Sequence, residues 1–280
     1  MTSVSFKEFE HQAWQQAVEQ YDASFSRLTQ QTIPAILDAL SIQKGTRLLD
    51  VACGPGYLAA AAYQKGAEVC GVDFSSAMLL RAKQLHPLIA FHEDDAEILH
   101  THPDRSFDAV AMNFGIIHLG EPEKALKAAE RVLKLGGKIA FTAWCPPQEA
   151  VGFSLVLRAV EQFGNLHIVL PTAPPLFFYG NSEHCKQALL QCGFTNATTQ
   201  IIHQLWEIQS PDELFEAFLK GTARTAGLLK RQSSEQLTAI RKAIRQEIQT
   251  YMLDGKITIP MPAILAYATK TALSRSLADS

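Results

Sequence analysis

The chain has few cysteines, and their spacing argues against two kinds of site. Five cysteines occur in 280 residues, an odd number with no Cys-x-x-Cys pair. Zinc sites and secreted disulfide frameworks both rely on paired or closely spaced cysteines. The sequence therefore predicts no disulfide-stapled domain and no zinc site, and no other set of residues forms a metal-ligand pattern. A reducing cytoplasm is the compartment that this cysteine usage favours.

Long apolar runs and a strong net charge are also lacking. Residues 1–10 do not contain the apolar core of a signal peptide, and no stretch reaches the roughly 20 apolar residues that span a bilayer. The formal net charge is -3, which gives no broad positive surface for nucleic acid. We therefore expect no integral membrane association and no nucleic-acid substrate. The oligomeric state is left open.

What the sequence does contain is an apolar strand that runs into a Gly-x-Gly turn. Residues 48–59 read Leu-Leu-Asp-Val-Ala-Cys-Gly-Pro-Gly-Tyr-Leu-Ala. Gly54 and Gly56 permit backbone conformations and a close ligand approach that a Cβ would obstruct. The helix that follows offers unpaired N–H groups and the positive end of its dipole. This pattern predicts a loop that binds a nucleotide cofactor.

Two classes of cofactor fit this loop. Gly54-x-Gly56-x-x-Ala59 matches the dinucleotide fingerprint, with Asp73 at a suitable distance for a ribose-binding acid. Asp50, which precedes the turn, instead favours a cationic ligand such as S-adenosylmethionine, which carries a sulfonium and an ammonium and no phosphate. The alternative for either acid is that it only caps the helix that follows.

Residues 48–57 closely resemble motif I of the class I S-adenosylmethionine-dependent methyltransferases, of the type similar to ubiquinone and menaquinone biosynthesis methyltransferases. The resemblance continues in the correct order through residues 68–75, 90–97, 107–115 and 131–141. One departure is Ala52, where that family more often has glycine. The resemblance implies that the chain binds S-adenosylmethionine and transfers its methyl group.

The resemblance also implies how the cofactor is held. The expected cofactor-binding residues are Tyr21, Asp50, Ala52, Gly54, Gly56, Asp73, Phe74, Met78, Asp95, Ala96, Asn113, Phe114 and Gly115. Asp73 would accept from the ribose hydroxyls, Phe74 and Met78 would flank the adenine, and residues 95–96 would bind the edge of that ring. Residues 113–115 would supply main-chain contacts near the methionine end. Core packing is the alternative for the apolar members of this set, and for Asp95 an ordinary place in a solvated turn.

The order of the predicted elements gives the fold class. Residues 45–145 alternate strand and helix, which predicts a Rossmann-like α/β fold with a mostly parallel, seven-stranded sheet. By resemblance its last strand is antiparallel. We expect five regions: an N-terminal helical cap at 1–44, the cofactor-binding core at 45–145, a substrate-side loop with a helix and strand six at 146–210, a helical lid at 211–254, and the final strand and tail at 255–280. Strand six is expected at 197–208 and strand seven at 255–271.

One histidine is a candidate for acid–base chemistry. His118 follows the fourth predicted strand, near the expected meeting point of acceptor and methyl group, and would be the catalytic base if the nucleophile needs one. A packing or cofactor-positioning role is the alternative, and His92 is a second candidate. The acceptor is expected to be a small molecule, apolar or ring-containing, as the lid and the aromatic residues 177–179 suggest. The alternative functions are an NAD(P)-dependent oxidoreductase and a non-catalytic S-adenosylmethionine-binding protein.

Overall fold

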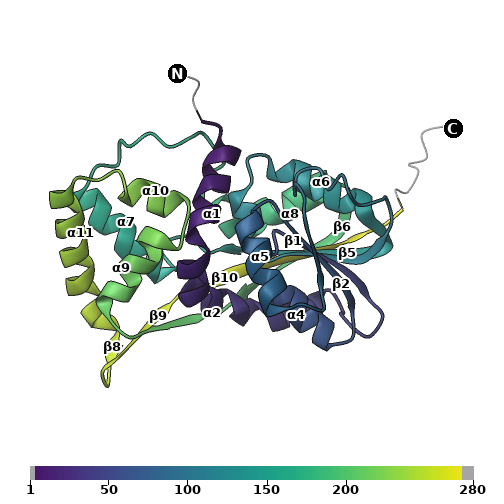
Figure 1. Cartoon of the computed structure of the whole chain (residues 1–280), viewed down its shortest axis with the longest axis horizontal. Helices are drawn as coiled ribbons and strands as arrows, with labels where there is room; N and C mark the ends of the chain where they lie inside the picture. Colours follow the sequence, from purple (N-terminus) through teal and green to yellow (C-terminus); the bar gives the residue numbers. More distant parts are fainter. Residues whose placement is uncertain (1–3, 273–280) are drawn as a thin grey trace.

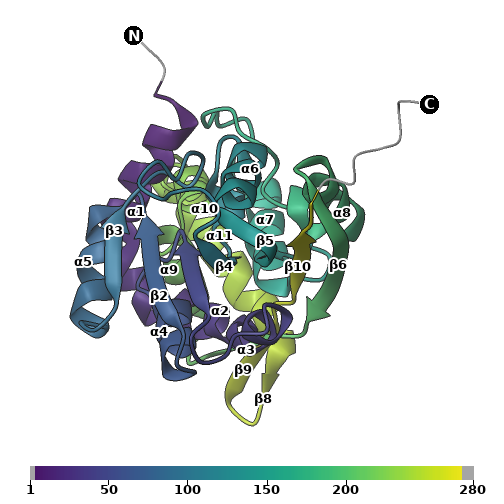
Figure 2. The same ribbon diagram turned by 90° about the vertical axis from the view of Figure 1, so that its right-hand side faces the viewer.

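The computed structural model describes residues 4–272 and contains one large sheet of seven strands. Their order is β3-β2-β1-β4-β5-β10-β6, and Figure 2 shows β3 near one edge and β6 near the other. Only β10 runs antiparallel to its neighbours β5 and β6. The predicted fold class is confirmed. The strands are β1 (Arg47–Val51), β2 (Glu68–Asp73), β3 (Ala90–Glu93), β4 (Phe107–Met112), β5 (Leu133–Trp144), β6 (Phe194–Ile202) and β10 (Ala263–Lys270).

Helices cover both faces of this sheet because successive strand residues are apolar on both sides. In β1, Leu48 packs with the helices α3 and α4, whereas Leu49 packs in the cluster that contains α6 and α8. Helix α5 lies beside β2 and β3. These helices are α3 (Ile33–Ala39), α4 (Tyr57–Gln64), α5 (Ser76–Leu85), α6 (Pro122–Val132) and α8 (Ser182–Gln191).

A second group of helices lies to one side of the sheet, and α1 stands between the two groups (Figure 1). Three of its members, α9, α10 and α11, lie along the chain between β6 and β10, the sixth and seventh strands of the sheet. The helical insertion is expected at this place. The remaining α-helices of the described chain are α1 (Phe6–Ala23), α2 (Phe25–Thr29), α7 (Val151–Phe163), α9 (Pro211–Lys220), α10 (Arg224–Leu229) and α11 (Ser234–Glu247). Its short 3₁₀ helices are η1 (Gln30–Thr32), η2 (Ile116–His118), η3 (Phe178–Gly180) and η4 (Ile248–Tyr251).

Two expected strands are divided in the structure, and the end of the first pairs with the start of the second in another sheet. This sheet has the order β7-β9-β8, with β7 (Leu205–Ile208), β8 (Met252–Leu253) and β9 (Lys256–Pro260). The predicted bounds 197–208 and 255–271 were therefore wrong. Pro260 and Pro262 lack the N–H that a continuous strand would need, and Asp254-Gly255, both at positive φ, form the tight turn between β8 and β9.

Residues 146–180 are not simply the substrate-side loop that we expected. Residues 151–163 form α7, whose buried side chains Phe153, Val156 and Val160 recur at helical spacing. Helix α7 packs against α9 and α11 and so belongs with the second group of helices. The irregular parts of this region are shorter, at 146–150 and 164–177.

Gly56 shows how tightly the loop after β1 is packed, and its substitution tests that packing. It begins α4 with φ +82, and a Cβ there would lie 2.6 Å from the Phe91 ring. We expect Gly56→Ala to lower the free energy of unfolding by about 2–4 kcal/mol, from left-handed strain and overpacking together. Urea unfolding measures the change.

Gly45→Ala is the matched control. Gly45 has the same φ of +82 but nothing within 4 Å of a Cβ, so its substitution should show the strain alone. Equal losses in the two variants would contradict the role that we give to Phe91.

Candidate functional site

Two adjoining cavities open at the carboxyl ends of the parallel strands. The larger contains about 820 Å³ of space between atoms, its mouth included, and the smaller extends toward residues 94–97. They share five lining residues: Ala52, Asp73, Phe74, Gly115 and His118. The expected site residues Tyr21, Gly54, Met78, Asn113 and Phe114 also line the larger cavity, and Asp95 and Ala96 line the smaller. Most of the predicted site residues therefore line the two cavities, and their contacts with a cofactor stay a prediction.

Asp73 and Gly54 form the floor where the two cavities meet. One carboxylate oxygen of Asp73 accepts from the Gly54 N–H at 2.8 Å, and the other accepts from the Ser75 N–H at 2.8 Å. Burial raises the pKa of Asp73, and these hydrogen bonds oppose the rise. A Cβ at Gly54 would meet nothing within 4 Å, so the space above this glycine is open to a ligand.

Asp50 and Gly56 lie behind this floor, and within residues 4–272 neither lines the two cavities. Asp50 is 1% exposed and accepts from the Ala59 N–H at 3.0 Å, which fixes the start of α4. Burial raises its pKa to about 8. The structure therefore places Asp50 as a support for the loop, and its direct contact with a cofactor stays a prediction.

Ala52 occupies the position where the resembled family favours glycine. Its φ is +53, in the left-handed region that costs a residue with a Cβ about 1–2 kcal/mol. Its methyl group lies against Gly115, since a Cβ added at Gly115 would be 2.6 Å from the Cβ of Ala52. The extra methyl group thus narrows the junction of the two cavities.

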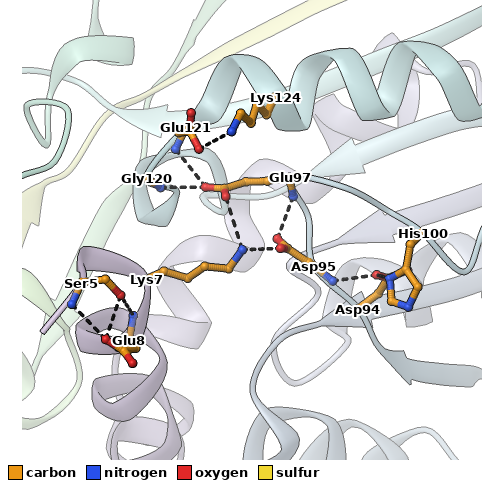
Figure 3. Close-up of polar contacts among 10 residues, drawn as sticks. All are labelled: Ser5, Lys7, Glu8, Asp94, Asp95, Glu97, His100, Gly120, Glu121 and Lys124. Atoms are coloured by element: carbon orange, nitrogen blue, oxygen red, sulfur yellow. Dashed lines mark hydrogen bonds and ion pairs between the residues drawn. The ribbon is translucent and has the colours of Figure 1, made fainter.

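The smaller cavity is bordered by a network of charged side chains that ties α1 to the turn after β3 (Figure 3). Lys7 of α1 forms an ion pair with Asp95 and a second one, at 3.3 Å, with Glu97. Glu97 also accepts from the N–H groups of Gly120 and Glu121, both at 2.9 Å. A ligand amino group that binds Asp95 would therefore share this carboxylate with Lys7. The sequence did not reveal the ion pair between Lys7 and Asp95.

The turn itself is held by Asp94. Asp94 accepts from the Asp95 N–H at 2.7 Å and from His100 at 2.7 Å. Burial alone would raise the pKa of Asp94, but the hydrogen bonds to it, those from Thr101 above all, lower it. The Ala96 N–H donates to no group in the described part of the chain, which leaves it available to a ligand.

Polar groups of two other predicted site residues, Tyr21 and Asn113, already have hydrogen-bond partners within the protein. The hydroxyl of Tyr21 pairs with Thr29 at 3.1 Å, and burial raises its pKa to about 12, so it stays protonated near neutral pH. The Asn113 side chain joins β5 to α2 and η1, because its oxygen accepts from Thr32 and Thr142 and its nitrogen donates to the Thr29 carbonyl. The Phe114 N–H donates to Thr142 at 2.9 Å, so it is already paired, and the expected main-chain contacts at 113–115 stay a prediction.

The far end of the larger cavity is an aromatic chamber. Phe114 stacks on Trp144 with ring centroids 4.1 Å apart, and Phe153 lies 5.7 Å from Trp144. Phe25 and Leu176 complete this wall. The expected aromatic residues 177–179 do not line it within the described chain: Phe177 packs behind Phe153, Phe178 stacks on His184, and Tyr179 bonds Glu123. The suggestion that residues 177–179 form the acceptor surface was therefore wrong.

The two candidate histidines, His118 and His92, lie in different places in the structure. His118 lines both cavities, with 22% of its side chain exposed. His92 lies on β3, in a different surface hollow beside Arg47 and Glu68, so it is not placed to act at this site. Glu10 of α1 pairs with His118, and Arg224 of α10 pairs with Glu10; no local sequence signal could have identified either residue.

Known proteins resemble this chain in sequence, most clearly over the strands and helices that form the cavities. Residues 49–141 match the family model described as a methyltransferase domain. These residues, which run from β1 into β5, therefore resemble a methyltransferase domain. The chain is 35% identical over 142 residues to the demethylmenaquinone methyltransferase of Renibacterium salmoninarum, a match that covers 49% of this chain and 60% of that protein. The chain therefore spans less than two thirds of this relative.

Two solved structures share the fold of this chain. One is phosphoethanolamine N-methyltransferase 2 of Haemonchus contortus in complex with S-adenosyl-L-methionine, with TM-score 0.59, 21% identity, and coverage of 97% of this chain and 61% of that one. The other is the [4+2]-cyclase SpnF, with TM-score 0.59, 17% identity, and coverage of 96% and 98%. At these identities the likeness shows the fold alone, and a cyclase on the same fold means that activity has to be argued from the site.

The residues present suit S-adenosylmethionine. Two carboxylates, Asp73 and Asp95, line the smaller cavity, a free N–H lies beside the second, and the space above Gly54 is open. The glycine loop, residues 52–57, contains no lysine or arginine. In residues 4–272 no three metal-binding side chains gather, and no helix there could cross a membrane.

Proposed function

We propose that this protein is an S-adenosylmethionine-dependent methyltransferase whose acceptor is a small, apolar, ring-containing molecule. The observation that carries the proposal is the continuity of the cavity. Its polar end offers Asp73 and Asp95, its other end offers Phe25, Trp144 and Phe153, and both parts share His118. A flat apolar ring would find stacking partners in that chamber.

Each end of the cavity has a defined task in this proposal. S-adenosylmethionine supplies an electrophilic methyl carbon, and Asp73, Asp95 and the Ala96 N–H would hold its nucleoside part. The chamber would orient the acceptor for in-line attack, and such positioning alone can supply several kcal/mol of the rate acceleration. Helices α1, α9 and α10 would act as the lid that excludes water.

The compartment that we propose is a reducing cytoplasm, in which the five cysteines would stay as free thiols.

A methyl-transfer assay with labelled S-adenosylmethionine tests the proposal directly. We expect label to pass to hydroxylated aromatic or quinol rings and not to phosphoethanolamine. Phe153→Ala should raise the KM for the ring acceptor about tenfold, because a stacking partner is lost, while the Kd for S-adenosylmethionine stays unchanged. Phe178→Ala, a ring outside the chamber, is the matched control and should change neither value.

Two outcomes would contradict the proposal. Transfer to phosphoethanolamine but to no ring would overturn the acceptor class. Tight cofactor binding without transfer to any acceptor would favour a non-catalytic binding protein instead.

A further inference from the structure

A buried cluster of four side chains lies where the two cavities meet. Glu10 and Trp14 come from α1, His118 from η2, and Arg224 from α10. One Glu10 oxygen, Oε2, accepts from Trp14 Nε1 at 3.0 Å and pairs with His118 Nδ1 at 2.9 Å. Glu10 is 0% exposed, so these contacts are screened from solvent. The cluster joins three segments that are far apart in the sequence.

The contact with Glu10 determines how the His118 ring presents itself. A carboxylate only accepts, so Nδ1 must carry the proton, and the neutral ring then has its lone pair on Nε2. Nε2 has no hydrogen-bond partner among residues 4–272, although it is not fully buried. His118 lines both cavities, and its Nε2 is therefore available there as a proton acceptor.

Arg224 balances the charge of the buried carboxylate. Its Nε lies 3.5 Å from Glu10 Oε1, and only 13% of its side chain is exposed. Its two terminal nitrogens donate to the Pro174 carbonyl at 2.6 Å and to the Ile117 carbonyl at 2.7 Å. A buried carboxylate needs a positive partner. Because Arg224 supplies it, His118 can stay neutral beside Glu10.

We propose that Glu10 and Arg224 are positioning residues that keep His118 as a neutral proton acceptor for a ring hydroxyl of the acceptor; this rests on the proposed function. The hydroxyl gives its proton to Nε2 as its oxygen bonds the methyl carbon. The carbon–sulfur bond of the donor breaks, and its electron pair stays on sulfur. The imidazolium then returns its proton to water. Because Arg224 begins α10, this arrangement is complete only when that helix is docked.

Two substitutions should move the pH dependence in opposite directions. Three charged groups act on His118 most directly: Glu10, which pairs with it, Arg224, which pairs with Glu10, and Asp73 from β2. The charged residues Lys7, Asp94, Asp95 and Glu97 also line the smaller cavity with His118, and both substitutions leave them unchanged. Glu10→Gln removes a negative charge beside the ring and disfavours its protonated form, so the acid limb of kcat/KM should move about one unit to lower pH. Arg224→Gln leaves Glu10 uncompensated, so that limb should move to higher pH. A purely structural role would lower activity at every pH without moving the limb.

A histidine NMR titration of the protein without ligands gives the same test independently of turnover. The His118 signal is assigned by its loss in His118→Gln, and its midpoint should move down in Glu10→Gln and up in Arg224→Gln. Arg224→Lys, which keeps the charge, should return it to near the wild-type value and replaces Arg224→Gln if that variant does not fold. Arg241→Gln is the control and should leave it unmoved, because Arg241 is a half-buried arginine of α11 that pairs with Asp212.

The outcomes separate this proposal from the proposed function. Midpoints that stay fixed, or that move in the same direction in both variants, would overturn the positioning roles even if methyl transfer is observed. Opposite movements with no transfer to any ring would support the charge arrangement and contradict the proposed function alone.

Discussion

Asp73→Ala is expected to weaken S-adenosylmethionine binding by roughly 10- to 100-fold, which corresponds to about 1–3 kcal/mol of lost charge-assisted hydrogen bonding. The carboxylate is the acid that both cavities share, and it also holds the Gly54 N–H that shapes the loop. Isothermal titration measures the change in Kd, and a thermal melt shows whether the variant stays folded.

Asp108→Asn is the matched control for Asp73. Asp108 likewise accepts a backbone N–H, from Arg47 at 2.9 Å, but it lies at the opposite end of its strand, away from the cavity. Its replacement should leave the Kd unchanged. Wild-type affinity in Asp73→Ala, or an equal loss in Asp108→Asn, would contradict the assignment of Asp73.

The second large effect concerns stability, and it comes from Asp50. Burial raises the pKa of Asp50 to about 8 from an ordinary value of 3.8, and the nearby Asp73 adds to the rise. The folded state therefore binds this proton more tightly than the unfolded state does. That contribution to stability is complete below about pH 4 and is lost as the pH rises to about 8. Over the whole window it amounts to on the order of 5 kcal/mol.

Asp50→Asn removes this titration and keeps an oxygen for the Ala59 N–H. We expect the free energy of unfolding of the variant, measured in urea at pH 5, 6.5 and 8, to fall less steeply with pH than that of the wild type. A residual slope should remain, because burial also raises the pKa of Asp73. Parallel curves for wild type and variant would show that Asp50 is not the group responsible.

Asp212→Asn provides the control for the stability experiment. Its pKa is lowered to about 2 by Arg245 and Arg241, so its contribution is lost only as the pH falls through that value. It titrates outside the range from pH 5 to 8. The slope in that range should therefore match the wild type.

The parts of the fold that were predicted correctly have signals confined to a short stretch of chain. The alternation of strand and helix over 45–145 identified the sheet, and the glycines at 54 and 56 marked the loop that the structure places beneath the cavity. Where local cues were overlooked, the prediction failed: the helical spacing of Phe153, Val156 and Val160 indicates α7, and the Asp254-Gly255 turn indicates the hairpin of the second sheet.

The rest of the site depends on contacts between distant segments. Glu10 meets His118 across 108 positions of sequence, and no pattern near either residue reports the contact. The same holds for the aromatic chamber, where Phe25, Trp144 and Phe153 come from three separate elements. A run of neighbouring aromatics at 177–179 is conspicuous in the sequence, yet packing turns those rings toward other partners. Only the folded arrangement shows which side chains share the cavity.

Titration of the protein with S-adenosylmethionine, S-adenosylhomocysteine and NADH tests the central claim most directly. If Asp73, Asp95 and the open space at Gly54 form a site for a cationic nucleoside donor, the first two ligands should bind with micromolar Kd and NADH should not bind. Preferential binding of NADH would contradict the account and return the glycine loop to the dinucleotide-dependent oxidoreductases.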